Sequence, residues 1–302
     1  MPQRRSVIVT GGASGLGKIM SSHFASLGDS VTIFDVNAAD GEAVAAELDA
    51  AQKKAQAQAN ANGGGVRFEK CDVSSWTEQK AAFKAVYEAI GRVDVVMANA
   101  GIAEHGRSWI VPSREEDEGE LDKEPALKVL DVNLEWGSVK LAQYYMRRNT
   151  PDPTTGFRGS IICTASNVGL YPFPPAPLYA ASKHAVVGLV RSLGPIYGMS
   201  HVGIRINALA PAVLGYALRN YTYKPLKTAT NIAGTDALFN NMILTPDSTL
   251  VKGVEKLLNN VELNGQVLEI HGDNVTVRPP HDVIDADSRH NLAEFVRFRY
   301  GQ

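Results

Sequence analysis

Ser6-Val-Ile-Val-Thr10-Gly11-Gly-Ala-Ser14-Gly15-Leu16-Gly17 is the stretch that decides the fold of this chain. Its first five residues predict a short buried strand, and helical spacing follows over Lys18 to Leu27. The glycines between them allow a tight turn and let a pyrophosphate approach the free amides at the N-terminus of the helix. The stretch therefore predicts a strand, a phosphate-binding turn and a helix, and a plain glycine-rich turn is the alternative.

A carboxylate closes the second apolar run, Val31-Thr-Ile-Phe-Asp35. Asp35 follows Gly17 by 18 residues (35 − 17 = 18), near the spacing at which an acidic residue meets the adenosine ribose of a bound dinucleotide. We therefore predict a ribose-binding role for Asp35, against the alternative that it ends a turn or caps a helix.

Short apolar runs and helical segments alternate along most of the chain. Further strands are predicted at 66–71, 93–98, 160–164, 202–208 and 266–270, and helices at 40–60, 76–90, 126–148, 178–197 and 245–258. This alternation predicts an α/β fold with a doubly wound, seven-stranded parallel sheet and helices on both faces. Ligands bind such sheets at the carboxyl ends of the strands, where Asp35, Asp72 and Asn99 fall.

Tyr179 and Lys183 form a candidate proton-transfer pair. They are four residues apart, so a helix over 178–197 presents both side chains on one face, one turn apart. A lysine ammonium beside a phenol lowers the pKa of the phenol from about 10 toward neutral pH, which makes the tyrosine an acid or base. Ser166 lies upstream across the Pro-rich turn 171–177, which can bring its hydroxyl beside the tyrosine. The alternative is a surface lysine that covers an aromatic ring.

The composition excludes several classes of protein. The 302 residues include 30 Lys and Arg against 32 Asp and Glu, so no basic excess attracts nucleic acid or an anionic membrane. Cys71 and Cys163 each lie in an apolar run, which suits a reducing compartment and supports neither a disulfide framework nor a metal site. No apolar run approaches about 20 residues, and the N-terminus lacks the apolar segment of a signal peptide. We therefore expect a cytoplasmic protein without nucleic-acid or membrane partners and without a bound metal.

Three segments depart from the alternation of strands and helices. Residues 103–124 include a strongly acidic run, which predicts a solvated insertion. Residues 211–244 are long, irregular and rich in large apolar side chains, which is typical of a lid over a lipophilic substrate. Residues 271–302 follow the predicted catalytic domain 1–270 as an apolar C-terminal extension, which we expect to pack on the domain or on a second subunit.

These motifs resemble the short-chain dehydrogenase/reductase family, of the compact single-domain Rossmann type, over Ser6 to about Ile270. Thr10-Gly11-x-x-x-Gly15-x-Gly17 is similar to the family's cofactor loop, and Asn99-Ala100-Gly101 is similar to its fourth-strand motif. The family's catalytic tetrad is matched, with its usual spacing between serine and tyrosine (179 − 166 = 13), by Asn133, Ser166, Tyr179 and Lys183. The run 179–188, together with Asp35, resembles the NAD-dependent alcohol dehydrogenases related to hydroxyprostaglandin dehydrogenase.

The resemblance implies a role for each of these residues. Tyr179 takes the proton of an alcohol while hydride leaves for the nicotinamide, Lys183 lowers the tyrosine pKa and binds the nicotinamide ribose, and Ser166 orients the substrate oxygen. Asn133 holds a water that links Lys183 to solvent, Asp72 meets the adenine, and Asn99 meets the adjacent ribose. The implied cofactor-binding residues are Gly11, Ser14, Gly15, Leu16, Gly17, Asp35, Asp72, Val73, Asn99, Ala100, Gly101, Tyr179, Lys183, Pro211 and Val213.

The sequence departs from the family pattern after the sixth predicted strand. Pro211-Ala212 stands where Pro-Gly is usual, and the threonine often found a few residues later is replaced by Leu214, Gly215 or Tyr216. The contacts to the nicotinamide carboxamide are therefore not carried over from the family.

The expected function is that of an NAD-dependent oxidoreductase that interconverts a lipophilic secondary alcohol and its ketone. Asp35 favours NAD as the cofactor, because the 2′-phosphate of NADP would face its carboxylate. Reduction of a carbonyl intermediate in biosynthesis and a cofactor-binding scaffold with a non-redox reaction are the alternatives. In the family, the helix with Tyr179 and the helix around Asn133 pair across a two-fold axis, so we expect a homodimer or homotetramer.

Overall fold

The computed structural model describes residues 4–59, 64–103, 127–199, 201–215 and 242–300. Its strands are β1 (Ser6–Thr10), β2 (Ser30–Asp35), β3 (Val66–Lys70), β4 (Val95–Ala98), β5 (Gly159–Thr164), β6 (Ile204–Pro211), β7 (Val267–His271) and β8 (Asn274–Arg278). Its helices are α1 (Gly15–Ser26), α2 (Ala38–Ala59), α3 (Trp76–Ile90), α4 (Lys128–Asn133), α5 (Trp136–Met146), α6 (Pro177–Tyr197), α9 (Asp247–Asn259) and α10 (Ala286–Tyr300), with a 3-10 turn η2 (Asn167–Gly169).

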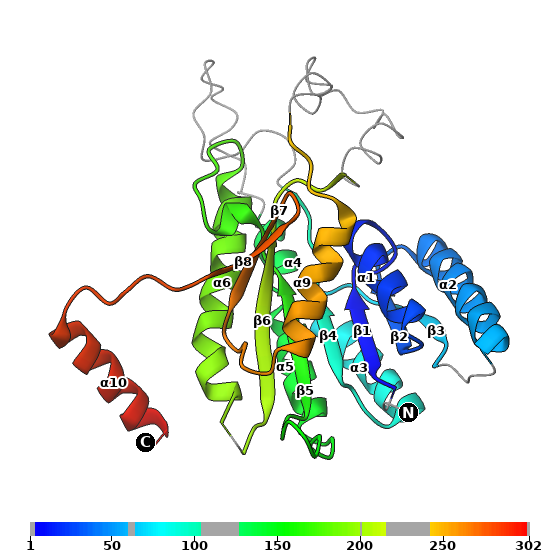
Figure 1. Cartoon of the computed structure of the whole chain (residues 1–302), viewed down its shortest axis with the longest axis horizontal. Coiled ribbons are helices and arrows are strands. Elements are labelled where there is room, and N and C mark those ends of the chain that lie inside the picture. The colour runs from blue at the N-terminus through cyan, green and yellow to red at the C-terminus, as the bar shows by residue number, and fades with distance from the viewer. Residues whose placement is uncertain (1–3, 60–63, 104–126, 200, 216–241, 301–302) are drawn as a thin grey trace.

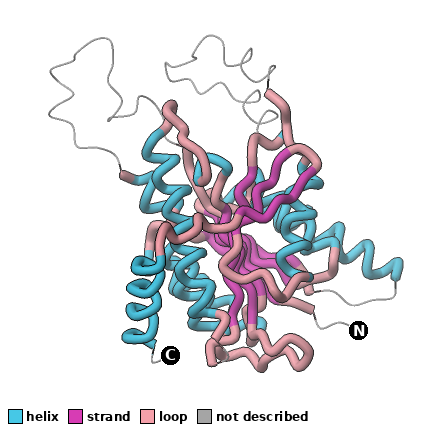
Figure 2. Tube along the Cα trace, turned by 60° about the vertical axis from the view of Figure 1, so that its left-hand side comes forward, coloured by secondary structure: helices cyan, strands magenta, loops and turns pink. Residues whose placement is uncertain are grey.

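All eight strands form one sheet in the order β3-β2-β1-β4-β5-β6-β7-β8. The first seven are parallel, as the alternation of strands and helices predicts. Figures 1 and 2 show the twisted sheet between two layers of helices. The chain therefore has the doubly wound Rossmann-like fold that the sequence predicts, in which strand order reverses between β1 and β4.

The seven predicted parallel strands are confirmed, and the segment expected to be a separate C-terminal extension supplies an eighth, antiparallel strand that the prediction missed. β8 pairs with β7 in antiparallel register, from Val267 opposite Arg278 to His271 opposite Asn274. The tight loop between them contains Gly272, whose φ of +50° is readily adopted by glycine. The sheet thus ends in a hairpin rather than in the parallel strand β7.

The prediction of a single helix over 126–148 was wrong. Two helices occupy this region, α4 and α5, and Glu135 between them has φ 46° and ψ 33°. This left-handed conformation interrupts the α-helical path. Among the described residues other than glycine, Glu135 alone has a positive φ. The break turns the Glu135 side chain into the protein, where the residue is 3% exposed.

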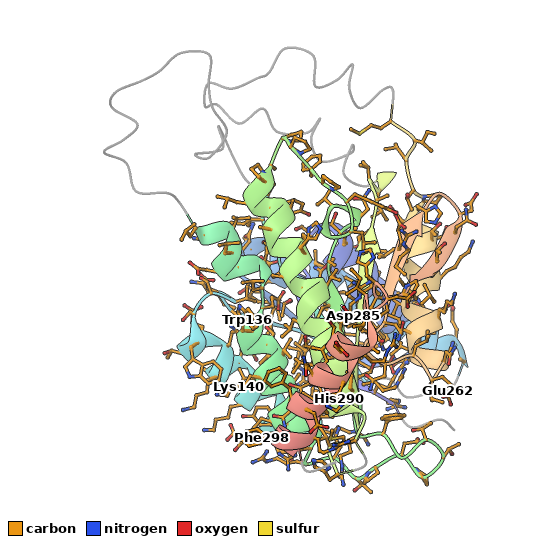
Figure 3. The ribbon with its side chains drawn as sticks, turned by 90° about the vertical axis from the view of Figure 1, so that its left-hand side faces the viewer. Trp136, Lys140, Glu262, Asp285, His290 and Phe298 are labelled. Atoms are coloured by element: carbon orange, nitrogen blue, oxygen red, sulfur yellow. The ribbon has the colours of Figure 1, made fainter. Side chains whose placement is uncertain are left out.

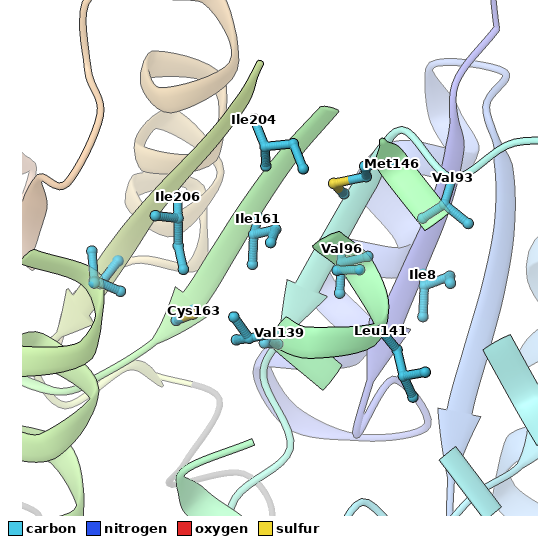
Figure 4. Packing of buried hydrophobic residues seen from close by; sticks show 14 of the residues in the cluster. Ile8, Val93, Val96, Val139, Leu141, Met146, Ile161, Cys163, Ile204 and Ile206 are labelled. Atoms are coloured by element: carbon cyan, nitrogen blue, oxygen red, sulfur yellow. The ribbon is translucent and has the colours of Figure 1, made fainter. Parts of the chain in front are cut away.

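The core consists of two apolar clusters, one on each face of the sheet. Successive residues of a strand point to opposite faces, so Ile8 of β1 joins the cluster beneath α3, α5 and α6, while Val7 and Val9 join the cluster beneath α1, α2 and α9. Figure 4 shows the first of these clusters, with a row formed by Ile8, Val96, Ile161 and Ile206 from four neighbouring strands. Because both faces are covered, the central strands are rigid and their carboxyl ends are held in fixed positions.

Helix α10 lies apart from the rest of the molecule, at the end of an extended segment that follows β8 (Figure 1). Figure 3 shows Asp285 just before this helix, His290 and Phe298 along it, and Trp136 and Lys140 on α5. Phe295 and Phe298 of α10 are 72% and 91% exposed. The two parts of the predicted extension 271–302 therefore differ. β8 packs on the domain as part of the sheet, whereas α10 presents apolar side chains to solvent, and its packing on a second subunit stays a prediction.

Two other predicted segments fall largely beyond the described residues. The acidic insertion 103–124 lies outside them except for Ala103, and so does most of the predicted lid 211–244. At the described ends of the lid segment, Leu214 is buried and forms an isolated bridge with Thr245. Within the described ranges, no helix combines the length and the hydropathy needed to cross a bilayer.

Candidate active site

A cleft of about 490 Å³ opens at the carboxyl ends of the central strands. The residues of the predicted site that line it are Gly11, Ser14, Gly15, Leu16, Asp35, Asp72, Val73, Asn99, Ala100, Gly101, Ser166, Tyr179, Lys183 and Pro211. They come from the ends of six strands, β1 to β6, the loops that follow them, and helices α1 and α6, so the parallel sheet brings together side chains that are far apart in the sequence.

Three residues of the predicted site do not line the cleft. Gly17 is buried in α1, and a Cβ atom there would lie 2.0 Å from the carbonyl oxygen of Gly11, so Gly17 packs the loop against the helix. Val213 lies beyond the end of β6, and its carbonyl oxygen accepts a hydrogen bond from the amide of Thr245 at 2.8 Å. Asn133 is buried beneath the cleft, at 2% exposed.

The glycine loop fits a pyrophosphate. Gly11 and Gly15 have φ of +61° and +54°, which L side chains rarely adopt, and the turn that they form leaves Ser14, Gly15 and Leu16 facing the cleft. Ser14 is the N-cap of α1 but its side chain makes no capping hydrogen bond. Amides at the start of this 12-residue helix therefore face the cleft, together with the positive end of its dipole.

Asp35 ties the glycine loop to the end of β2 and also lines the cleft. Its Oδ2 accepts a hydrogen bond from the amide of Ala13 at 3.1 Å, and its Oδ1 accepts one from the amide of Asn37 at 3.1 Å. A carboxylate oxygen can accept more than one hydrogen bond, so both oxygens retain capacity for ribose hydroxyls. The turn-forming role and the ribose-binding role are therefore compatible.

The next wall of the cleft is formed by Asp72, Val73 and two residues that the prediction missed, Cys71 and Lys128. Hydrogen bonds from the side chain and amide of Ser74 lower the pKa of Asp72, and the positive charge of Lys128 lowers it further. Cys71 directly precedes Asp72, so its position at a strand end could have indicated it. Lys128 follows a long segment without strand or helix signals, and nothing in its sequence context pointed to the site.

Lys183 is the most buried of the charged residues that line the cleft. The residue is 3% exposed, and Nζ donates a hydrogen bond to the carbonyl oxygen of Thr164 at 2.8 Å. Nζ lies 5.7 Å from the centre of the Tyr179 ring, so the two side chains are on one face of α6. Burial lowers the pKa of Lys183 to about 8. A surface lysine that covers a ring, the alternative to the catalytic pair, does not describe this side chain.

Ser166 closes the cleft opposite α6. It is the N-cap of η2, where its Oγ accepts a hydrogen bond from the amide of Val168 at 3.4 Å. The hydroxyl has two acceptors within reach, Asn167 Oδ1 at 3.2 Å and the carbonyl oxygen of Pro211 at 3.4 Å. These are long hydrogen bonds, so the hydroxyl is held in place weakly and can exchange them for a bond to a substrate oxygen.

Asn133 fastens the segment after β4 to α6. Its Oδ1 accepts a hydrogen bond from the amide of Ile102 at 2.8 Å, and its Nδ2 donates to the carbonyl oxygen of Ile102 and to Ser182 Oγ, both at 3.0 Å. A Cβ atom on Gly101 would lie 3.3 Å from Asn133 Oδ1 and 3.4 Å from Lys183 Nζ. The asparagine side chain therefore supports the cleft from below, and the water-holding role stays a prediction.

A second group of buried polar residues was missed by the sequence analysis. Thr10 Oγ1 accepts hydrogen bonds from the amides of Asn99 and Ala100 at 2.8 and 2.9 Å and donates to Glu135 Oε1 at 2.6 Å. Thr164 Oγ1 donates to Asn99 Oδ1 at 3.0 Å. Glu135, like Asn133, is a polar residue within an otherwise apolar helical pattern, and this signal could have found it.

Residues 5–225 match the family model described as short chain dehydrogenase. The chain belongs to the short-chain dehydrogenases. Members of this family are oxidoreductases that use a nicotinamide cofactor, NAD or NADP, and the cleft offers groups for both ends of such a molecule: the start of α1 and Asp35 at one, Lys183 and Tyr179 at the other. Among the described residues, no group of three or more His, Cys, Asp or Glu side chains could hold a metal ion.

This short-chain dehydrogenase is similar to curated proteins from fungi and bacteria. It is 37% identical over 209 residues to short-chain dehydrogenase/reductase prx4 of Penicillium roqueforti, a match that covers 68% of this chain and 53% of the relative. It is 32% identical over 222 residues to a 3beta-hydroxysteroid dehydrogenase of Mediterraneibacter gnavus, over 74% of this chain and 70% of the relative. It is 31% identical over 280 residues to a 5'-hydroxyaverantin dehydrogenase of Dothistroma septosporum, over 88% and 84%. The chain thus spans about half the length of the prx4 proteins that it matches.

Proposed function

We propose that this short-chain dehydrogenase uses NAD to interconvert a lipophilic secondary alcohol and its ketone. The observation that carries the proposal is the placement of Lys183, a buried amine that faces Tyr179 at the floor of a cleft also lined by Ser166. A buried ammonium at this point stabilises a neighbouring phenolate, because little solvent screens the interaction. Tyr179 can therefore accept a proton near neutral pH.

In the proposed mechanism Ser166, Tyr179 and Lys183 act together on the alcohol. Ser166 Oγ and the phenolate oxygen of Tyr179 hold the hydroxyl of the alcohol. Tyr179, as phenolate, takes the proton of that hydroxyl, the carbon–oxygen bond becomes a carbonyl, and the hydride on the same carbon leaves. NAD, when bound, supplies the acceptor of that hydride. Lys183 keeps the phenolate stable and is itself held by the carbonyl oxygen of Thr164 at 2.8 Å. In the reducing direction the same residues act in reverse order.

Asp35 supports NAD rather than NADP as the cofactor. A 2′-phosphate at the adenosine ribose would place up to two negative charges near its carboxylate. Lys18, the basic residue just after the glycine loop, is paired with Glu47 on α2, with 2.8 Å between Nζ and Oε2. The cations that line the cleft are Lys128, which acts on Asp72, and Lys183. No described side chain that lines the cleft therefore offers a cation at Asp35.

The proposed substrate class rests on the cleft and on the relatives. Apolar side chains of Ile102, Val132 and Ala165 line the cleft along with the catalytic residues. Two relatives bear the names of dehydrogenases for a hydroxysteroid and for hydroxyaverantin. The narrower resemblance to hydroxyprostaglandin dehydrogenase is part of this proposal, as is a cytoplasmic location.

The alternatives differ from the proposal in what they predict. Reduction of a carbonyl intermediate uses the same residues and predicts faster turnover of ketones with NADH than of alcohols with NAD. A scaffold with a non-redox reaction predicts cofactor binding without turnover.

The first experiment is incubation with NAD and a panel of secondary alcohols, followed through the absorbance of NADH. We expect lipophilic cyclic alcohols to be oxidised and sugars of similar size to be left unchanged, and we expect NADP to support far slower oxidation. Parallel reactions with the matching ketones and NADH compare the two directions. Cofactor binding without turnover of any alcohol or ketone would contradict the proposal.

A further inference from the structure

Glu135 is a buried acid that the mechanism above does not use. It is 3% exposed, and it adopts a left-handed backbone conformation at φ 46° that glycine would adopt at lower cost. The second oxygen of its carboxyl group, Oε2, is buried and has no hydrogen-bond partner among the described residues. A strained, buried and partly unsatisfied carboxyl group is costly for stability, so a functional reason for it is worth seeking.

Four hydrogen bonds lead from Glu135 to Lys183. Thr10 Oγ1 donates to Glu135 Oε1 at 2.6 Å, and Asn99 Nδ2 donates to the carbonyl oxygen of Thr10 at 3.0 Å. Thr164 Oγ1 donates to Asn99 Oδ1 at 3.0 Å, and Lys183 Nζ donates to the carbonyl oxygen of Thr164 at 2.8 Å. The chain of bonds crosses the ends of β1, β4 and β5, which together form the floor of the cleft.

The hydrogen bonds of Thr10 fix the direction of the bond to Glu135. Two amides, those of Asn99 and Ala100, already donate to Thr10 Oγ1, so the hydroxyl must donate its own hydrogen. Glu135 Oε1 is the nearest acceptor, at 2.6 Å against 3.3 Å for the carbonyl oxygen of Met97. Oε1 therefore carries no proton, and a proton on this carboxyl group must be on Oε2.

Lys183 is the charged group with which Glu135 interacts most strongly. The titratable groups that face it are Lys183 from α6, Cys163 from β5 and Cys71 at the end of β3. Burial raises the pKa of both thiols to about 12, so they are neutral. Glu135 and Lys183 therefore interact as an acid and a base in an interior from which water is largely excluded.

We propose that Glu135 is a positioning residue for the reaction: through Thr10 and Asn99 it fixes the end of β4 beside the catalytic lysine, and its negative charge keeps Lys183 protonated. This inference rests on the proposed function, because it assigns the task of keeping the ammonium that stabilises the Tyr179 phenolate. Without the carboxylate, burial alone acts on Lys183, and the amine loses its proton at lower pH.

The pH dependence of turnover distinguishes this role from a structural one. Burial raises the pKa of Glu135 to about 7, so its charge is present above that pH and absent well below it. Glu135→Gln keeps an acceptor for Thr10 but removes the charge. We expect the alkaline limb of kcat/KM to move to lower pH by about one unit in this variant, which is a tenfold loss on that limb. Below about pH 6 parent and variant should differ less than twofold, because both are neutral at this position.

Glu269→Gln is the matched control, because Glu269 is a buried acid on β7 that accepts a hydrogen bond from Tyr171 at 2.9 Å and does not line the cleft. Its alkaline limb should coincide with that of the parent. If Glu135→Gln lowers activity equally at every pH, or shifts the limb no more than the control does, Glu135 is a structural residue and the inference is wrong. If the glutamine variant does not fold, Glu135→Asp keeps the charge and should keep the limb within about 0.3 pH units; a one-unit shift would overturn the inference.

A second readout does not depend on turnover. A carboxyl group whose folded pKa is raised stabilises the folded state below its unfolded pKa, and that contribution is lost as pH rises through the folded pKa. Between pH 5 and pH 8 the melting temperature of the parent should therefore fall relative to that of Glu135→Gln, by roughly 5 °C. If the difference in melting temperature between parent and variant is the same at pH 5 and pH 8, Glu135 does not carry a buried charge. If the parent oxidises no alcohol, the proposed function fails, and this comparison still tests whether Glu135 carries a buried charge above about pH 7.

Discussion

At the scale of single residues, the chemistry depends on how differently two neighbouring side chains are placed. Lys183 is buried and held at 2.8 Å by a carbonyl oxygen, whereas Tyr179 is partly exposed in the wall of the cleft. The buried cation cannot move toward solvent, so its field acts on the phenol that a substrate can reach.

Tyr179→Phe tests this division directly. The substitution keeps the ring and its packing on α6 but removes the hydroxyl that carries the proton. We expect kcat to fall by about a hundredfold or more while NAD binding is retained. Steady-state kinetics and NAD titration measure both effects. Turnover within threefold of the parent would show that another group carries the proton.

Lys183→Ala tests the tasks of the lysine apart from that of the tyrosine. The lysine has two expected tasks, stabilising the phenolate and binding the nicotinamide ribose, so kcat and NAD affinity should both fall, each by about tenfold or more. A variant that loses turnover but binds NAD as tightly as the parent would contradict the ribose-binding task.

Asp35 sets the expected cofactor preference. Repulsion of a 2′-phosphate together with lost hydrogen bonds of about 3 kcal/mol corresponds to about a hundredfold preference for NAD in kcat/KM. Replacing Asp35 by Ser and Asn37 by Arg should narrow or reverse this ratio. If the parent uses both cofactors equally, the contacts of Asp35 with Ala13 and Asn37 are its whole role.

At the scale of elements, the unit of β1, glycine loop and α1 is closely packed. A Cβ atom on Gly17 would lie 2.0 Å from the carbonyl oxygen of Gly11, so Gly17→Ala must displace the loop. We expect it to cost about 1–3 kcal/mol of stability and to weaken NAD binding. Gly188→Ala on α6 is the control, because no atom lies within 4 Å of the added methyl group, and it should stabilise by about 0.5–1 kcal/mol. Thermal unfolding of both variants measures the contrast, and equal effects would contradict the packing argument.

Some of these elements could be predicted from the sequence and others could not. The alternation of apolar runs with helical spacing was sufficient for seven parallel strands and for the cleft at their carboxyl ends, because that pattern follows from burial of both sheet faces. It was insufficient for the break at Glu135, since the residues on both sides keep helical spacing and the break depends on a tertiary hydrogen bond to Thr10. It also missed β8, whose hairpin signal is a short loop with Gly272 beyond the family match.

The residues of the candidate site likewise fall into those that the sequence could predict and those that it could not. Residues at strand ends and in glycine turns could be predicted, because their local sequence fixes them at one edge of the sheet. Lys128 and Glu135 could not, because each reaches the site through contacts between elements distant in sequence. Gly17 was predicted as a cofactor contact, but it does not line the cleft, and the atom nearest to a Cβ added at Gly17 would be the carbonyl oxygen of Gly11.

At the scale of the whole molecule, two exposed apolar surfaces remain. Trp136 and Tyr144 on α5 are 54% and 49% exposed, and α10 presents Leu292, Phe295 and Phe298 at 55%, 72% and 91%. Exposed large apolar side chains of this number are typical of surfaces that another chain covers.

We therefore predict at least a homodimer in solution. Light scattering at micromolar concentration should give a mass of twice the 32.5 kDa of one chain, or four times that mass for a tetramer. Trp136→Glu places a charge on α5 and should shift the population toward monomer if α5 lies in the interface. A monomeric parent at this concentration would contradict the prediction.

The central claim is that hydride passes from the carbon of a secondary alcohol to NAD in the cleft that contains Tyr179 and Lys183. Its most direct test is one turnover with an alcohol deuterated at that carbon, followed by mass spectrometry of the cofactor. We predict that the reduced cofactor carries one deuterium with the parent protein and that almost none forms with Tyr179→Phe in the same time. Reduced cofactor without deuterium, or equal deuterium transfer by the phenylalanine variant, would contradict the account.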